Sequence, residues 1–168
     1  MSHAKSLRVI GQSLEAARIS TFELEKYGPQ YMLWTDSVTE AGEAILQNAL
    51  RHNKAASQDA RHPRVFCFGP ADISRLDAQA QKQRRNQSQS ATPAEKLLSH
   101  GLRTLGDHFD RMQVHGFRIE WAMDSVSIHY QRVNGPSHSK TFTVEELREL
   151  CAHSSLRRSG LYLFPPDA

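Results

Sequence analysis

The sequence predicts an α+β protein: an internally duplicated α-β-β-α-β unit with pseudo-twofold symmetry, in which antiparallel sheets pack against helices. The chain aligns with itself at a shift of 95 residues, and the hydrophobic period changes from helical to alternating at the same place in both copies. Each copy then continues into a second helix and a short apolar strand. The composition of the 168 residues, 39% hydrophobic and 23% charged, is that of a globular protein.

The repeat aligns residues 7–34 with residues 102–129 without a gap. Five of the aligned pairs are identical: Leu7/Leu102, Arg8/Arg103, Gly11/Gly106, Phe22/Phe117 and Glu25/Glu120. Seven further pairs keep an apolar residue in both copies. Such agreement in one register indicates two copies of one structural unit.

Helices and hairpins follow from the spacing of apolar residues. Apolar residues three and four apart predict helices over 7–17 and 102–112, each with one apolar face. Alternating apolar residues then predict a β-hairpin in each copy, over 22–33 and 117–130, because successive strand side chains point to opposite faces. The segment 27–30, Tyr-Gly-Pro-Gln, has ordinary turn chemistry for the first hairpin.

A second helix and a last strand complete each unit. Ser37 with Glu40, and Thr143 with Glu146, match capping boxes, in which a hydroxyl and a carboxylate three residues on satisfy helix N–H groups. Short apolar runs at 65–68 and 161–164 precede prolines, which cannot donate to a sheet ladder, and predict the last strand of each unit.

The expected organisation is a first repeat over 1–70, a polar basic helix and linker over 71–93, and a second repeat over 94–168. The helix of the middle segment, 72–85, follows an Asp cap, and 86–93 has the composition of a linker. The halves either pack face to face or extend each other's sheets. In an alternative fold the strand at Val65 joins the second half and makes it a ferredoxin-like β-α-β-β-α-β sandwich.

Gly11 and Gly106 occupy equivalent positions inside the two first helices. Glycine in a helix costs about 1 kcal/mol relative to alanine. Its presence at one position in both copies predicts a close approach of helix to sheet.

Motifs for hydrolysis, nucleotide binding and zinc proteolysis are absent, so we expect no catalytic residues and no cofactor. The best candidate metal ligands cluster around one helix: His100, Asp107, His108, Asp110 and His115. Adjacent helical residues point about 100° apart, so Asp107 and His108 cannot both face one ion, and we expect no metal. Cys67 and Cys151 share no metal-ligand spacing and are expected to be buried free thiols.

The positive charge is concentrated in one stretch. The whole chain has a formal net charge of +3, whereas residues 51–86 carry eight basic and three acidic groups. Cations beside a Gln/Asn/Ser tract suit a phosphate backbone. The candidate nucleic-acid-binding residues are Arg61, Arg64, Lys82, Arg84, Arg85, Arg157 and Arg158. In the other interpretation these cations are a solvated helix end that complements the helix dipole.

Met32 and Trp34 alternate with the apolar residues of their strand and so lie on its other side. Trp34 is a candidate for stacking on bases, although the paired aromatics of the RNA-recognition signature are absent. Burial against another layer and a partner-binding patch are the alternatives.

The sequence therefore favours a non-catalytic binding module that binds nucleic acid through its basic segment. The alternative is a protein-interaction or oligomerisation module that uses exposed sheet faces or edge strands to bind a protein partner or to form a homo-oligomer. No apolar run is long enough for a membrane span, and residues 1–8 lack the apolar core of a signal peptide. We expect a cytoplasmic protein without a membrane partner.

Overall fold

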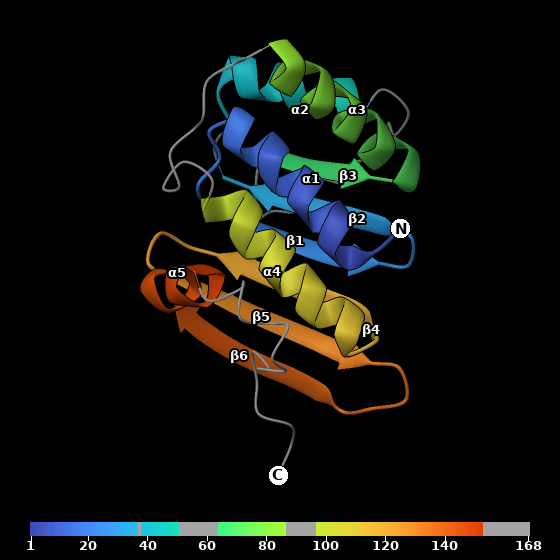
Figure 1. Cartoon of the computed structure of the whole chain (residues 1–168), viewed down its shortest axis with the longest axis vertical. Coiled ribbons are helices and arrows are strands. Elements are labelled where there is room, and N and C mark those ends of the chain that lie inside the picture. Colours follow the sequence, from blue (N-terminus) through green and yellow to red (C-terminus); the bar gives the residue numbers. More distant parts are fainter. Residues whose placement is uncertain (37, 51–63, 87–96, 153–168) are drawn as a thin grey trace.

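A computed structural model describes residues 1–36, 38–50, 64–86 and 97–152 of the chain. Within these ranges the fold is α+β, with five helices and one six-stranded antiparallel sheet (Figure 1). The elements are α1 His3–Ala16, β1 Phe22–Tyr27, β2 Gln30–Thr35, α2 Glu40–Leu50, β3 Arg64–Phe68, α3 Pro70–Asn86, α4 Leu97–Arg111, β4 Val114–Trp121, β5 Ser125–Arg132, β6 Ser137–Thr143 and α5 Val144–Ala152.

The sheet has the strand order β3-β2-β1-β4-β5-β6, so it runs without a break from the first half of the chain into the second. β1 and β4 pair antiparallel at its centre, where Leu24 lies opposite Ile119. The two halves therefore extend each other's sheets. β3 pairs with β2, with Val65 opposite Trp34, so this strand belongs beside the first hairpin and the ferredoxin-like alternative is wrong.

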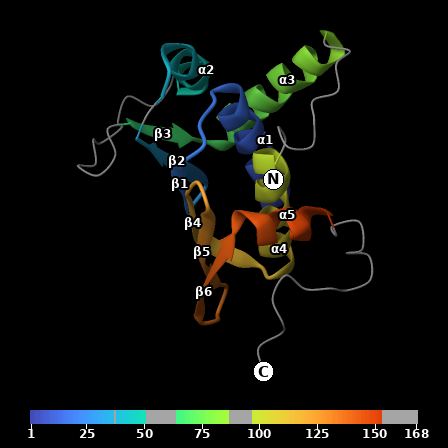
Figure 2. The same cartoon turned by 90° about the vertical axis from the view of Figure 1, so that its left-hand side faces the viewer.

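The core lies between the sheet and the helices α1 and α4. These two helices run next to each other across one face of the sheet, and α5 lies on the same side (Figure 2). Their apolar faces bury Leu7, Ile10 and Leu14 from α1 and Leu102, Leu105 and Phe109 from α4. Strand residues alternate accordingly, and Leu24 and Ile119 are fully buried beneath the helices.

The two helix glycines lie where α1 and α4 cross. A Cβ at Gly11 would come within 2.7 Å of Ser99 Cα, and one at Gly106 within 2.5 Å of Ala4 Cα. Both glycines are buried. The close approach is therefore between helix and helix, and the expected approach of helix to sheet is wrong.

Helix starts follow the expected capping chemistry in part. At α5 the Thr143 and Glu146 side chains each accept the other residue's backbone N–H, at 3.1 and 2.8 Å, which confirms that capping box. α2 begins at Glu40, and the hydroxyl of Thr39 accepts the Gly42 N–H at 3.1 Å. Thr39 thus caps this helix. The expected cap, Ser37, lies outside the described residues.

α3 begins two residues before its expected start. Pro70 takes the first helical position, where its missing N–H is no loss. Asp72 lies inside the first turn and accepts the backbone N–H of Gly69 at 2.8 Å, so it reaches back over the helix start instead of preceding it.

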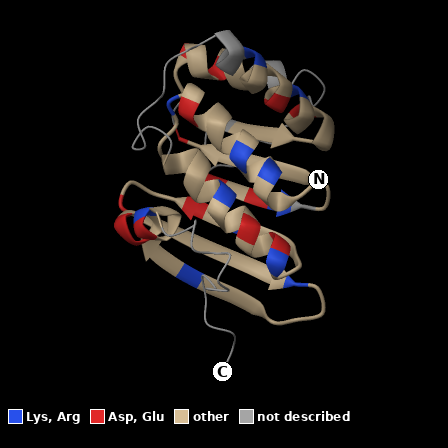
Figure 3. Cartoon of the chain, in the orientation of Figure 1, with Lys and Arg blue, Asp and Glu red and all other residues tan. Residues whose placement is uncertain are grey.

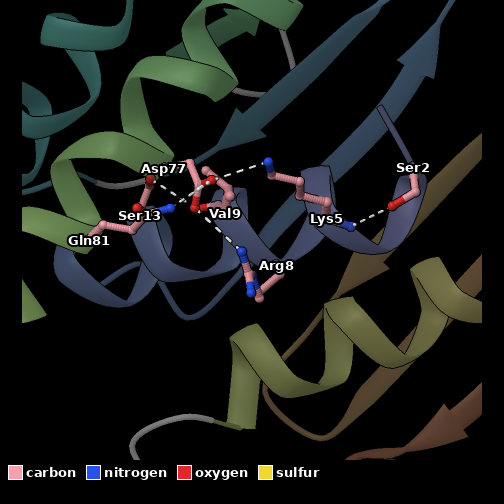
Figure 4. A network of polar contacts seen from close by, with 7 residues as sticks. All are labelled: Ser2, Lys5, Arg8, Val9, Ser13, Asp77 and Gln81. Carbon is pink, nitrogen blue, oxygen red and sulfur yellow. Dashed lines mark hydrogen bonds and ion pairs between the residues drawn. The ribbon is translucent and has the colours of Figure 1, made fainter.

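A nearly buried carboxylate attaches α3 to α1 (Figure 4). Asp77, 7% exposed, lies 3.4 Å from both Lys5 Nζ and Arg8 Nη2, and it accepts a hydrogen bond from Gln81 at 3.3 Å. One acidic residue of the basic segment is therefore already neutralised by cations of the first helix.

The predicted second hairpin ends at residue 130, but a further strand, β6 Ser137–Thr143, follows it. β6 pairs antiparallel with β5, with His129 opposite Ser139. The second half therefore has a third strand before its second helix, where the first half has its third strand after it. The expected strand at 161–164 and most of the linker at 86–93 lie outside the described residues.

Candidate functional site

The sheet face that points away from α1 and α4 carries side chains that the core does not use, and we call it the open face. Cross-strand pairing arranges these residues in two rows. One row contains Cys67, Met32, Glu25, Arg118, His129 and Ser139; the other contains Val65, Trp34, Glu23, Glu120, Ser127 and Thr141. The face is thus apolar at its β2–β3 end and polar elsewhere.

The apolar end, which we call the apolar strip, consists of Met32, Trp34, Val65 and Cys67. Met32 lies opposite Cys67, and Trp34 lies opposite Val65. All four are half-buried, so neither Met32 nor Trp34 is part of the core between sheet and helices. The thiol of Cys67 donates to Gln30 Oε1 at 3.3 Å. Neither Cys67 nor Cys151 forms a disulfide, as expected, but both are half-buried and not fully buried.

Three glutamates surround Arg118 in the middle of the open face. The guanidinium of Arg118 lies 2.5 Å from Glu23 and 3.2 Å from Glu120. Glu25 lies opposite Arg118 on the neighbouring strand. Because one cation is set among three carboxylates, this part of the face does not suit a polyanion.

A groove of about 700 Å³ lies where β1, β4, β5 and β6 come together, and residues from both sides of the sheet line it. We call it the histidine groove, and its ionisable lining residues are Glu25, Lys26, His115, Arg118, His129 and His138. A β-bulge forms part of it, since Val114 pairs with Arg132 and Gly116 with Gln131, which leaves His115 without a cross-strand partner in the register. His129 lies on the open face, whereas His138 lies opposite Tyr130, on the side of the sheet that the helices cover.

Lys26 lies at the rim of the groove next to this bulge. Its ammonium donates to the carbonyl oxygens of Gly28 at 2.9 Å and His115 at 3.3 Å. Burial lowers the pKa of Lys26 below its ordinary value, because a partly desolvated ammonium is less stable in its charged form.

The candidate metal ligands do not converge. Asp110 accepts the backbone N–H groups of His3 at 2.8 Å and Ala4 at 3.0 Å, and so caps α1. His108 is 2% exposed, with Nε2 3.3 Å from the Tyr130 hydroxyl, whereas His115 is exposed at the bulge of β4. In the ranges given above, no three His, Cys, Asp or Glu side chains are placed to hold a metal ion.

The structure describes the candidate nucleic-acid residues only in part. Lys82 is exposed on α3, and Arg84 and Arg85 belong to the last turns of that helix. Arg64 begins β3. The remaining candidates, Arg61, Arg157 and Arg158, lie outside the described residues. Figure 3 shows Lys and Arg interspersed with Asp and Glu on the helices that cover the sheet.

Comparisons with protein-family models, with curated proteins and with solved structures find no match for this chain. Of the helices that the structure describes, none has the length and apolar character needed to cross a membrane.

Proposed function

We propose that the protein is a non-catalytic interaction module that associates with a second copy of the chain through the open face of its sheet. The observation that carries this proposal is the apolar strip, four half-buried residues gathered on two neighbouring strands outside the core. Apolar surface outside the core is stabilised when a partner removes it from water. A twofold axis along the strip brings the same patch of both copies together.

The rest of the open face supports a protein partner over a nucleic acid. Arg118 pairs with Glu23 and Glu120, and Glu25 lies opposite it, so the carboxylates in the middle of the face outnumber this cation, disfavour phosphates and form a polar border to the strip. Polar borders around apolar centres are typical of protein interfaces.

Sedimentation equilibrium of the full chain tests this proposal. We expect a concentration-dependent dimer at about 100 μM, since that concentration populates complexes of micromolar affinity. Trp34→Ser, and the milder Met32→Gln, should weaken association. Val133→Ser is the matched control, because Val133 is exposed in the β5–β6 turn, away from the strip. A monomer at every concentration, or equal loss in the control, would overturn the proposal.

Nucleic-acid binding through the basic segment is the second candidate. The end of α3 favours it: Lys82, Arg84 and Arg85 lie within four residues, and no acidic residue occurs from 78 to 94. Asp77, the last acidic residue before them, already pairs with Lys5 and Arg8. The other candidates are Arg64, which begins β3, and Arg61, Arg157 and Arg158, which lie outside the described residues.

Fluorescence anisotropy of labelled single- and double-stranded DNA and RNA tests the second candidate. Binding should weaken steeply between about 50 and 200 mM salt, because phosphate contacts release counterions. The triple variant K82A/R84A/R85A should lose it. The control R103A/R111A/K140A removes the same charge from α4 and β6. An equal loss of nucleic-acid binding in both variants would show that the net charge of the protein alone attracts the nucleic acid, and would contradict a site at the end of α3.

We also infer that the chain arose by internal duplication with pseudo-twofold symmetry, and several contacts that recur 95 residues apart support this. Gly11 lies against Ser99 and Gly106 against Ala4, which are equivalent contacts under the shift. Glu15 accepts the Ser99 N–H at 2.8 Å, as Asp110 accepts that of Ala4. The residues after both helices, Arg18 and Gln113, have positive φ, 56° and 52°. The domain boundaries at 70 and 93 and the cytoplasmic location stay predictions.

A further inference from the structure

A second cavity, which we call the apolar pocket, lies on the side of the sheet that the helices cover. Its volume is about 360 Å³, within the range of small-molecule sites. The end of α1, the first turn of α4, the β4–β5 turn and the start of α5 surround it. Its main apolar lining residues are Ile19, Leu97, Leu98, Trp121, Met123 and Val144.

The apolar lining runs from the core out to the surface. Ile19 and Trp121 belong to the core, with 4% and 6% of their surface exposed, whereas Met123 is 85% exposed in the β4–β5 turn. An apolar group bound in the pocket would remove part of Met123 from water, which is favourable. The unbranched thioether of methionine adapts its shape to what it covers. The lining therefore suits an apolar side chain that enters from solvent.

Two side chains of opposite charge, Glu15 and Arg18, also line the pocket. Oε1 of Glu15 accepts the backbone N–H of Ser99 at 2.8 Å, which holds this carboxylate at the start of α4. A carboxylate can accept several hydrogen bonds, so Glu15 keeps acceptor sites for a ligand. Arg18 is exposed and forms no ion pair with any residue that the structure describes. The pocket thus offers one partner for a cation and one for an anion.

We propose that the apolar pocket binds a free α-amino acid with an apolar side chain. The ammonium of the ligand pairs with Glu15, its carboxylate pairs with Arg18, and its side chain lies among the apolar lining residues. A fatty acid would meet the like charge of Glu15, and an alkylamine would meet that of Arg18, so the two lining charges favour a zwitterion over either.

This proposal is independent of the protein association proposed above. The apolar pocket includes Trp121, which pairs with Phe22 on the buried side of the sheet, whereas the apolar strip lies on the open face. A ligand in the pocket and a second copy on the strip therefore use opposite sides of the sheet. Loss of one leaves the other in place.

The fluorescence of Trp121 tests the proposal, because this side chain lines the pocket and the chain contains only two tryptophans. In Trp34→Phe, which leaves Trp121 as the only tryptophan, we expect L-leucine to change the emission saturably. Three analogues each lack one group of leucine: isocaproate the ammonium, isoamylamine the carboxylate and glycine the apolar side chain. Each should bind at least about tenfold more weakly, as expected when a charge-assisted bond or the burial of an apolar side chain is lost.

Substitutions in the same background assign the two charges. Arg18→Gln should weaken leucine binding at least about tenfold and leave isoamylamine binding unchanged. Glu15→Gln keeps an acceptor for Ser99 N–H, and it should weaken leucine without weakening isocaproate. Arg103→Gln is the matched control, because Arg103 is exposed on α4 and does not line the pocket.

Three results would each overturn the proposal. They are an emission that does not change saturably with leucine, isocaproate or isoamylamine binding as tightly as leucine, and an equal loss of leucine binding in Arg18→Gln and Arg103→Gln. The comparison of leucine with its analogues needs no substitution in the pocket, so it decides the question even if a pocket variant fails to fold.

Discussion

At the scale of single residues, the burial of His3 makes the stability of the fold depend on pH. Its Nε2 lies 3.0 Å from the carbonyl oxygen of Val114 and so carries the proton, while Nδ1 is buried with no partner in the described part of the chain. Burial lowers the pKa of His3 below its ordinary value of 6.5, and the Val114 bond and Asp110 oppose this only in part. The unfolded chain therefore takes up this proton first as the pH falls.

The neutral, buried imidazole of His3 contributes its full stabilisation of the fold above pH 6.5. This stabilisation is lost as the pH falls toward the lower pKa of His3 in the folded state. We expect the urea midpoint to decrease less between about pH 7.5 and 5.5 in His3→Gln than in the wild type. His100→Gln, which alters an exposed histidine of α4, should keep the wild-type slope. Identical slopes in all three proteins would contradict this role of His3.

Residue-scale properties were predictable from the sequence where they depend on local pattern. The alternation around Trp34 placed it on the face opposite Leu33, and it lies there. The cross-strand partners of His129, Arg118 and Ser139, were not predictable, because they depend on which strands become neighbours across the sheet. Asp110 resembled a metal ligand for the same reason: its true partners, the N–H groups of α1, are more than 100 residues away in the chain.

At the scale of elements, helices and hairpins follow from the hydrophobic period, and α1, α4, β1, β2, β4 and β5 lie where it predicts them. The period did not predict β6, because only Phe142 of that strand is buried and its other side chains are polar. An edge strand with one buried residue has little alternation to detect. The crossing of α1 and α4 was not predictable either. A glycine inside a helix indicates that another element approaches closely, but it does not identify that element.

The crossing of α1 and α4 carries an element-scale prediction. Gly11→Ala and Gly106→Ala should each destabilise the fold by about 1–3 kcal/mol through overpacking, even though alanine favours a helix by about 1 kcal/mol. The reason is that each new Cβ meets backbone atoms of the other helix, which have no room to move aside. Gly116→Ala, where a Cβ fits at 3.6 Å, is the control and should change the free energy of unfolding little. Urea denaturation measures all three, and unequal losses at Gly11 and Gly106 would argue against equivalent crossing sites.

At the scale of the whole molecule, the two halves share both of their layers. β1 pairs with β4 in the sheet, and α1 packs on α4 above it, so the buried residues of both halves form one core. The sequence left open whether the halves stack or join, because the 95-residue repeat is compatible with both arrangements. Joining explains why Leu24 and Ile119, at the centre of the shared ladder, are fully buried.

A continuous core predicts that the halves unfold together. Leu24→Ala removes fully buried methyl groups from the centre of the sheet and should cost about 2–5 kcal/mol. Because small single-core domains unfold in one step, this loss should lower amide protection equally in β2, from the first half, and in β5, from the second. Native-state hydrogen exchange measures both strands in one experiment. Val133→Ala, at an exposed turn position, should leave protection unchanged. Loss confined to β1–β3 would mean that the halves are separate folding units joined only by one strand pair, and the shared α1–α4 layer would then contribute little to their coupling.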